Sequence, residues 1–132
     1  MERQVKCVDS AFCIDLVNGV PGAVTKSREL TESGERIGIP APALTEFLVG
    51  AFHQGGRRLS QALSLVAELE VLEITESIAV EAARAGGECS HRGEMVGTMD
   101  LLVAATAKHH HAHILSRDTD FARIGGVTLE TY

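Results

Sequence analysis

Residues 97–107, GTMDLLVAATA, form the stretch on which the interpretation of the whole sequence depends. Most of its side chains are apolar, which predicts a helix buried inside the protein. We expect Gly97 to allow the turn into this helix and Thr98 to cap its free amide groups. Asp100 lies in the first turn, where a charge is costly unless the helix N-terminus or a bound cation compensates it. The positions of the other acidic residues in the chain are needed to distinguish these two explanations.

Short apolar runs alternate with helical segments along the chain. The expected strands are residues 5–8, 36–39, 71–74, 114–115 and 127–129. Further helices are expected at residues 11–18, from 21 to near 34, from 42 to the glycines at 55 and 56, from 57 onward, and from 76 to about 92. This alternation predicts an α/β domain with a mainly parallel sheet of four to five short strands and helices on both faces. We expect the 132 residues to form a single domain, residues 1–132.

Two consecutive glycines, Gly86 and Gly87, interrupt the helical segment that begins at Glu76. Each glycine in a helix interior costs about 1 kcal/mol relative to alanine. We therefore expect a break or a bend in the helix at this position.

The composition fits a protein of the reducing cytoplasm. The formal net charge is −6, and 45% of the residues are hydrophobic. A negative charge gives no general attraction to nucleic acid, so an RNA or DNA partner requires a local basic patch. The three cysteines fit no metal-binding spacing, so we expect buried free thiols. No segment resembles a membrane span or a signal peptide, so we expect a cytoplasmic protein that does not contact a membrane.

Acidic residues stand at several junctions between strands and helices. Asp9 follows the first expected strand, Asp118 and Asp120 follow the fourth, and Glu46 lies early in the helix after the second. With Asp100, these side chains can all face the carboxyl end of the sheet, where open parallel sheets form their sites. Converging carboxylates repel one another unless they are protonated or bound to metal. Such oxygen ligands suit Mg²⁺ or Mn²⁺.

Each acidic residue also has a purely structural explanation. Asp9 is a favoured cap for the first helix, and Asp118 suits a turn or a cap. Glu46 and Asp100 are both typical first-turn residues that interact with the helix dipole. No single acid therefore identifies a site, and the order and spacing of all of them carry the argument.

Four segments of the chain resemble the four acidic motifs of PIN domains, in the same order. They are residues 8–10 (VDS), 42–47 (PALTEF), 99–107 (MDLLVAATA) and 115–121 (LSRDTDF), with residues 124–127 (IGGV) continuing the last. The likeness spans essentially the whole chain, and the size is similar to that of single-domain VapC toxins. The third and fourth motifs are the more specific ones. The resemblance implies a PIN-like, three-layer α/β/α fold.

By motif position, the resemblance assigns a set of site residues. The expected catalytic and metal-binding residues are Asp9, Glu46, Asp100 and Asp118, with Asp120 as a further metal ligand. Ser10 and Ser116 stand where small hydroxyl residues support the site in this family. Arg117 neighbours the expected site and is our candidate for contacting substrate phosphate. Other basic residues that can contact phosphate or simply be solvated are Lys26, Arg28, Arg57, Arg58 and Arg123.

The resemblance also implies a function. It predicts a ribonuclease that uses Mg²⁺ or Mn²⁺ to hydrolyse RNA phosphodiester bonds, as the toxin of a VapBC-type toxin–antitoxin pair. Homodimer formation and inhibition by a small cognate antitoxin are expected with it. The apolar residues Phe47, Phe52, Leu59 and Leu63 either provide such contacts or fill the protein's own core.

The sequence leaves open two other functions and one other metal site. A PIN scaffold that binds RNA or protein without cutting it is the main alternative. A receiver domain is disfavoured because the chain has no aspartate between Asp15 and Asp100 to accept a phosphoryl group. His109 and His113 have the i,i+4 spacing of a transition-metal site, although a surface turn at the end of the helix is the simpler explanation.

Overall fold

The computed structural model describes residues 5–132, in which five strands form one sheet. The strands are β1 (Val5–Val8), β2 (Arg36–Pro40), β3 (Glu70–Leu72), β4 (His113–Leu115) and β5 (Leu129–Glu130). Their order is β3-β2-β1-β4-β5, and all four pairings are parallel. The predicted α/β class and parallel sheet are therefore confirmed. β3 ends at Leu72 rather than at residue 74, because its partner β2 ends opposite it at Pro40.

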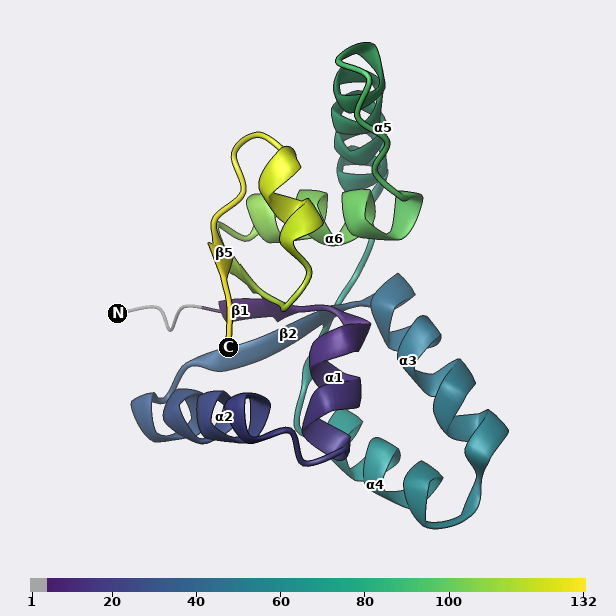
Figure 1. Ribbon diagram of the computed structural model, residues 1–132, viewed down its shortest axis with the longest axis vertical. Coiled ribbons are helices and arrows are strands. Elements are labelled where there is room, and N and C mark those ends of the chain that lie inside the picture. The colour runs from purple at the N-terminus through teal and green to yellow at the C-terminus, as the bar shows by residue number, and fades with distance from the viewer. Residues whose placement is uncertain (1–4) are drawn as a thin grey trace.

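Six α-helices surround the sheet (Figure 1). They are α1 (Ser10–Val17), α2 (Pro21–Ser33), α3 (Ala41–Gln54), α4 (Gly56–Ala67), α5 (Glu76–His91) and α6 (Thr98–His109), and a 3₁₀ turn, η1, spans Thr119–Arg123. Figure 1 shows α1 and α2 on one side of the sheet, α6 on the other, and α5 beyond α6. Because the strands are parallel, α1, α3 and α6 all begin near the carboxyl end of the sheet. No helix in residues 5–132 has the length and apolarity needed to cross a membrane.

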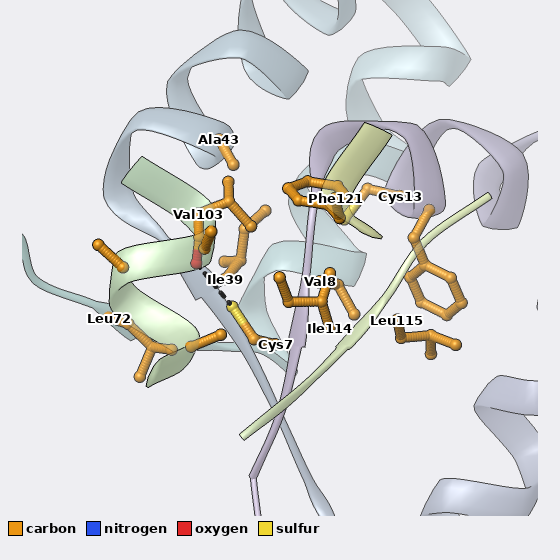
Figure 2. Close-up of a cluster of buried hydrophobic side chains, with 14 of the residues drawn as sticks. Cys7, Val8, Cys13, Ile39, Ala43, Leu72, Val103, Ile114, Leu115 and Phe121 are labelled. Atoms are coloured by element: carbon orange, nitrogen blue, oxygen red, sulfur yellow. Dashed lines mark hydrogen bonds between the residues drawn. The ribbon is translucent and has the colours of Figure 1, made fainter. Parts of the chain in front are cut away.

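The helix predicted at residues 97–107 packs against the central strands. Figure 2 shows Val103 of α6 beside Cys7 of β1, whose thiol donates a hydrogen bond to the Val103 carbonyl at 4.0 Å. Val103 and its neighbours Ala104 to Ala107 are buried. The one buried hydroxyl among them, Thr106, donates to the Leu102 carbonyl at 2.7 Å. The three cysteines are free and buried, as predicted.

The start of α6 differs from the prediction for Thr98. Gly97 occupies the cap position, no side chain caps the helix, and Thr98 is already the first helical residue. A hydroxyl caps free amides only from the cap position itself, where the backbone is still extended. The amide groups at this end of α6 therefore lack the cap that the sequence suggested.

The expected break at Gly86 and Gly87 does not occur, because α5 runs continuously from Glu76 to His91. The close packing of α5 against α6 explains the first glycine: a Cβ atom on Gly86 would lie 2.7 Å from Cδ1 of Leu101. The buried Ala85 and Cys89 hold the same stretch against the core. Tertiary packing thus outweighs the low helix propensity of the two glycines.

The two glycines are expected to respond differently to alanine. Gly87→Ala meets no atom within 4 Å, so it should raise the free energy of unfolding by about 0.5–1 kcal/mol through helix propensity alone. Gly86→Ala should lose that gain, because its Cβ displaces Leu101. Urea unfolding of both variants measures the difference. Equal stabilisation by the two substitutions would show that the α5–α6 contact does not require glycine.

Candidate metal centre

Asp9 links the first strand to the first helix and also faces the neighbouring strand. It is buried, and its Oδ1 accepts a hydrogen bond from the Phe12 amide at 3.0 Å, which caps α1. Its Oδ2 accepts a hydrogen bond from the Ser116 hydroxyl at 2.5 Å. The helix-cap explanation for Asp9 is therefore correct, and the same carboxylate also contacts the segment that follows β4.

Ser116 connects Asp9 with the fourth acidic motif. It is fully buried just after β4, which is the direct neighbour of β1 in the sheet. While its hydroxyl donates to Asp9, its Oγ accepts a hydrogen bond from the Asp118 amide at 3.0 Å. This pair of hydrogen bonds places Asp118 near Asp9.

Three carboxylates gather beside this link. One carboxylate oxygen each from Asp100, Asp118 and Asp120 lies within 4.8 Å of the others. Asp100 comes from the first turn of α6, and the other two come from the start of η1. The Oδ1 of Asp118 also accepts from the Asp120 amide at 2.9 Å, so the predicted cap role of Asp118 is present as well.

The electrostatics at Asp100 show that its negative charge is poorly compensated by the protein. Burial raises the pKa of Asp100 to about 6, and the charges of Asp118 and Asp9 add to the increase. Burial also raises the pKa of Asp9, although the hydrogen bonds from Ser116 and Phe12 oppose this. The amino-terminal end of α6 therefore does not restore an ordinary carboxylate at Asp100. A divalent cation is the compensation that this donor set fits, because Mg²⁺ and Mn²⁺ prefer carboxylate oxygens.

Glu46 lies outside the group of three carboxylates. It is exposed on α3, and its carboxylate accepts a hydrogen bond from the Ser10 hydroxyl. Since Ser10 directly follows Asp9, Glu46 stands next to the site rather than inside its most crowded part. The two serines named by the family resemblance each contact a different acid, Ser10 with Glu46 and Ser116 with Asp9.

Arg117 has partners that the sequence did not single out. Its Nε lies 2.9 Å from Oδ2 of Asp15, a buried residue of α1. The same carboxylate oxygen accepts a hydrogen bond from the Tyr132 hydroxyl at 2.6 Å. No spacing rule relates these three residues, because they belong to different segments that only the folded chain brings together.

The other basic and histidine candidates lie elsewhere or have other partners. Lys26 pairs with Glu29 at 3.8 Å, and Arg123 pairs with Asp120 at 3.7 Å. α6 ends at His109, and His113 already belongs to β4, so the i,i+4 pair does not form on a helix. Between residues 5 and 132, the only group with the composition and spacing of a metal site is the one formed by the three aspartates.

Comparison with known proteins identifies the family. The PIN domain family matches residues 6–127 of the chain. The chain therefore belongs to the PIN-domain family. It is 24% identical to the tRNA(fMet)-specific endonuclease VapC of Shigella flexneri over 128 residues, which cover 95% of this chain and 96% of the relative.

Solved structures share the fold over almost the whole chain. A chain in the crystal structure of VapBC2 from Rickettsia felis bound to a DNA fragment is 20% identical, with a TM-score of 0.86 and coverage of 97% of this chain and 98% of that one. A chain of the DNA-bound VapBC from Salmonella typhimurium is 23% identical, with a TM-score of 0.79 and 98% coverage of both chains. These similarities establish that the sheet and its helices follow the PIN arrangement.

The raised pKa of Asp100 predicts a pH-dependent stability in metal-free buffer. The folded protein holds a proton at Asp100 up to about pH 6, compared with 3.8 for an ordinary carboxyl group. The stabilising contribution of Asp100 to the free energy of unfolding is therefore fully present below pH 3.8 and is lost as the pH rises through about 6. Asp100→Asn, which cannot titrate, should gain in melting temperature relative to the unsubstituted protein between pH 4 and 7.

Thermal unfolding in EDTA across this pH range measures the effect. Glu73→Gln, a substitution on an exposed side chain, is the control and should show no such trend. A difference in melting temperature between Asp100→Asn and the unsubstituted protein that stays the same at every pH would contradict the prediction. Added Mg²⁺ should stabilise the unsubstituted protein more than Asp100→Asn.

Proposed function

We propose that this protein is a metal-dependent ribonuclease that hydrolyses RNA phosphodiester bonds and serves as the toxin of a VapBC-type pair. The observation that carries the proposal is the group of three carboxylates beside buried Asp9, in a chain of the PIN-domain family. The name of the Shigella relative, a tRNA-specific endonuclease, supports the same chemistry. We further propose that residues 1–132 act as one domain in the cytoplasm.

The residues proposed to hold Mg²⁺ or Mn²⁺ are Asp9, Glu46, Asp100, Asp118 and Asp120. A divalent ion held there would supply the activation of water and the stabilisation of negative charge on the scissile phosphate. Asp100, Asp118 and Asp120 form the compact part of this set, and Asp9 and Glu46 adjoin it through Ser116 and Ser10.

The protein's own groups have distinct tasks in this proposal. Ser116 and the Phe12 amide fix the orientation of the Asp9 carboxylate. The Asp100 carboxylate is proposed to hold the cation, whose charge would offset the burial and repulsion that raise the pKa of Asp100 to about 6 in the metal-free protein. Arg117 is proposed to contact an RNA phosphate next to the acidic group.

A PIN scaffold that binds RNA or protein without cutting remains the second candidate. The close approach of Asp100, Asp118 and Asp120 favours the nuclease, because carboxylates so placed repel one another unless they are protonated or bound to a cation. The two functions differ in one measurement, the metal-dependent cleavage of RNA.

The purified protein is expected to cleave RNA in Mg²⁺ or Mn²⁺ and to stop when EDTA is added. Asp100→Asn should lower the cleavage rate by about a hundredfold or more, because it removes a proposed metal ligand. Gel analysis of an initiator tRNA transcript and of total RNA measures this. Glu73→Gln should cut normally. Undiminished cleavage by folded Asp100→Asn would refute the assignment, and binding without cleavage by the unsubstituted protein would favour the scaffold.

A homodimer and an antitoxin are the proposed protein partners, as several similar structures are toxin–antitoxin complexes. Between α1, α3 and α4 lies a hollow of about 150 Å³ lined by residues that include Ile14, Gly50 and Arg58. The exposed apolar side chains Ile14 and Phe52 belong to these helices, whereas Phe47 is buried in the core. We propose that an apolar segment of the antitoxin occupies this hollow.

Filling the hollow is expected to prevent inhibition without affecting cleavage. A Cβ on Gly50 meets no atom within 4 Å, and the same holds for Gly87 on α5. Gly50→Leu should therefore fold, cut RNA normally and resist the proposed cognate antitoxin, while the matched control Gly87→Leu should remain inhibited. Cleavage assays with and without the purified antitoxin test this. Equal inhibition of both variants would place the antitoxin elsewhere.

A further inference from the structure

Asp15 is a buried carboxylate that the proposed chemistry does not use. It lies on α1 six residues after Asp9, only 8% of it is exposed, and it is not part of the group of three aspartates. A buried charge is costly unless it is paired and hydrogen-bonded. Both partners of the Asp15 side chain, Arg117 and Tyr132, meet at the same oxygen atom, Oδ2.

Tyr132 is held firmly enough to act as a fixed partner for Asp15. Its ring packs edge-on against Phe12 of the core, with ring centroids 5.2 Å apart. Its backbone lies over Gly22 of α2, where a Cβ would come within 3.1 Å of the Tyr132 carbonyl carbon. Burial and the neighbouring Asp15 charge raise the pKa of Tyr132, so its hydroxyl keeps the proton that it donates.

Arg117 keeps most of its hydrogen-bonding capacity free. A guanidinium group has five N–H donors, and the contact with Asp15 is made through Nε. The Arg117 side chain is 60% exposed, and Asp15 is its only ion-pair partner in the part of the chain that the structure describes. The two terminal nitrogens therefore remain available for a second, anionic partner outside the protein.

Arg117 is a direct sequence neighbour of the acidic site. It stands between Ser116, which holds Asp9, and Asp118, which belongs to the three-carboxylate group. A chain with a net charge of −6 and an acidic site repels RNA. A cation held in one place at that site offsets the repulsion better than a mobile surface arginine, because less side-chain entropy is lost when the phosphate binds.

We propose that Asp15 and Tyr132 are positioning residues that hold the Arg117 guanidinium ready to bind a backbone phosphate of the RNA substrate. This inference rests on the proposed ribonuclease function. It predicts that Asp15 and Tyr132 affect RNA affinity only through Arg117.

A double-mutant cycle tests this dependence. The probe is a fluorescein-labelled initiator tRNA transcript, with Kd measured by anisotropy in EDTA, and kcat and KM measured with Mn²⁺. Arg117→Ala should raise Kd and KM about tenfold and reduce the salt dependence of binding by roughly one phosphate contact, with kcat little changed. Asp15→Asn and Tyr132→Phe, which keep shape and packing, should raise Kd about threefold. In the Arg117→Ala background, both should have no further effect.

The exposed pair Arg36 and Glu70, 2.7 Å apart at the opposite end of the sheet, provides matched controls. Arg36→Ala and Glu70→Gln make the same changes in charge and should leave Kd and KM unchanged. If Asp15→Asn raises Kd equally with and without Arg117, the inference is overturned and Asp15 has a purely structural role. An Arg117→Ala protein that binds RNA normally would also overturn it. If the unsubstituted protein neither binds nor cuts RNA, the proposed function itself falls, and this inference falls with it.

Discussion

Mutual repulsion between carboxylates at the end of the parallel sheet is the constraint on which the rest of this structure depends. Asp100, Asp118 and Asp120 lie together, and Asp9 is buried beside them. Burial raises the pKa values of Asp100 and Asp9 and the neighbouring carboxylate charges add to the increase, so holding these acids together is energetically costly. The fold has to offset that cost, and it does so with the apolar contact between α6 and the central strands (Figure 2). Without that rigid support, the acidic side chains would be expected to move apart into solvent.

Two of these acids stabilise local structure while they form the site. Asp9 caps α1 through Oδ1 and reaches Ser116 through Oδ2, and Asp118 caps η1 while its own amide is held by Ser116. A carboxylate has two oxygens with several lone pairs, so one residue can do both. The structural and the functional explanations of these aspartates are therefore compatible, and hydrogen bonds to the cap fix the geometry of the site.

A positively charged side chain follows directly after Ser116 in the same part of the chain. Arg117 contacts Asp15 of α1, and Tyr132, from the segment after β5, donates to the same Asp15 oxygen. An acidic protein can then present a local positive charge without a general basic surface. The buried Asp15 carboxylate thus has an explanation that the group of three aspartates does not provide.

The sequence by itself determined the elements, their type and the residues at each junction, because helix and strand periodicity and turn residues act over a few neighbouring positions. It therefore predicted the parallel sheet, the buried helix at residues 97–107 and the acids near one end. It could not predict that Gly86 permits close packing of α5 on α6, that Gly97 takes the cap position, or that Glu46 stands apart from the three aspartates. Only the tertiary structure decided these points and the contacts of Asp9 with Ser116 and of Asp15 with Tyr132, which are 107 and 117 residues apart in the chain. Such contacts depend on strand order and helix packing, which bring together segments whose local patterns carry no information about one another.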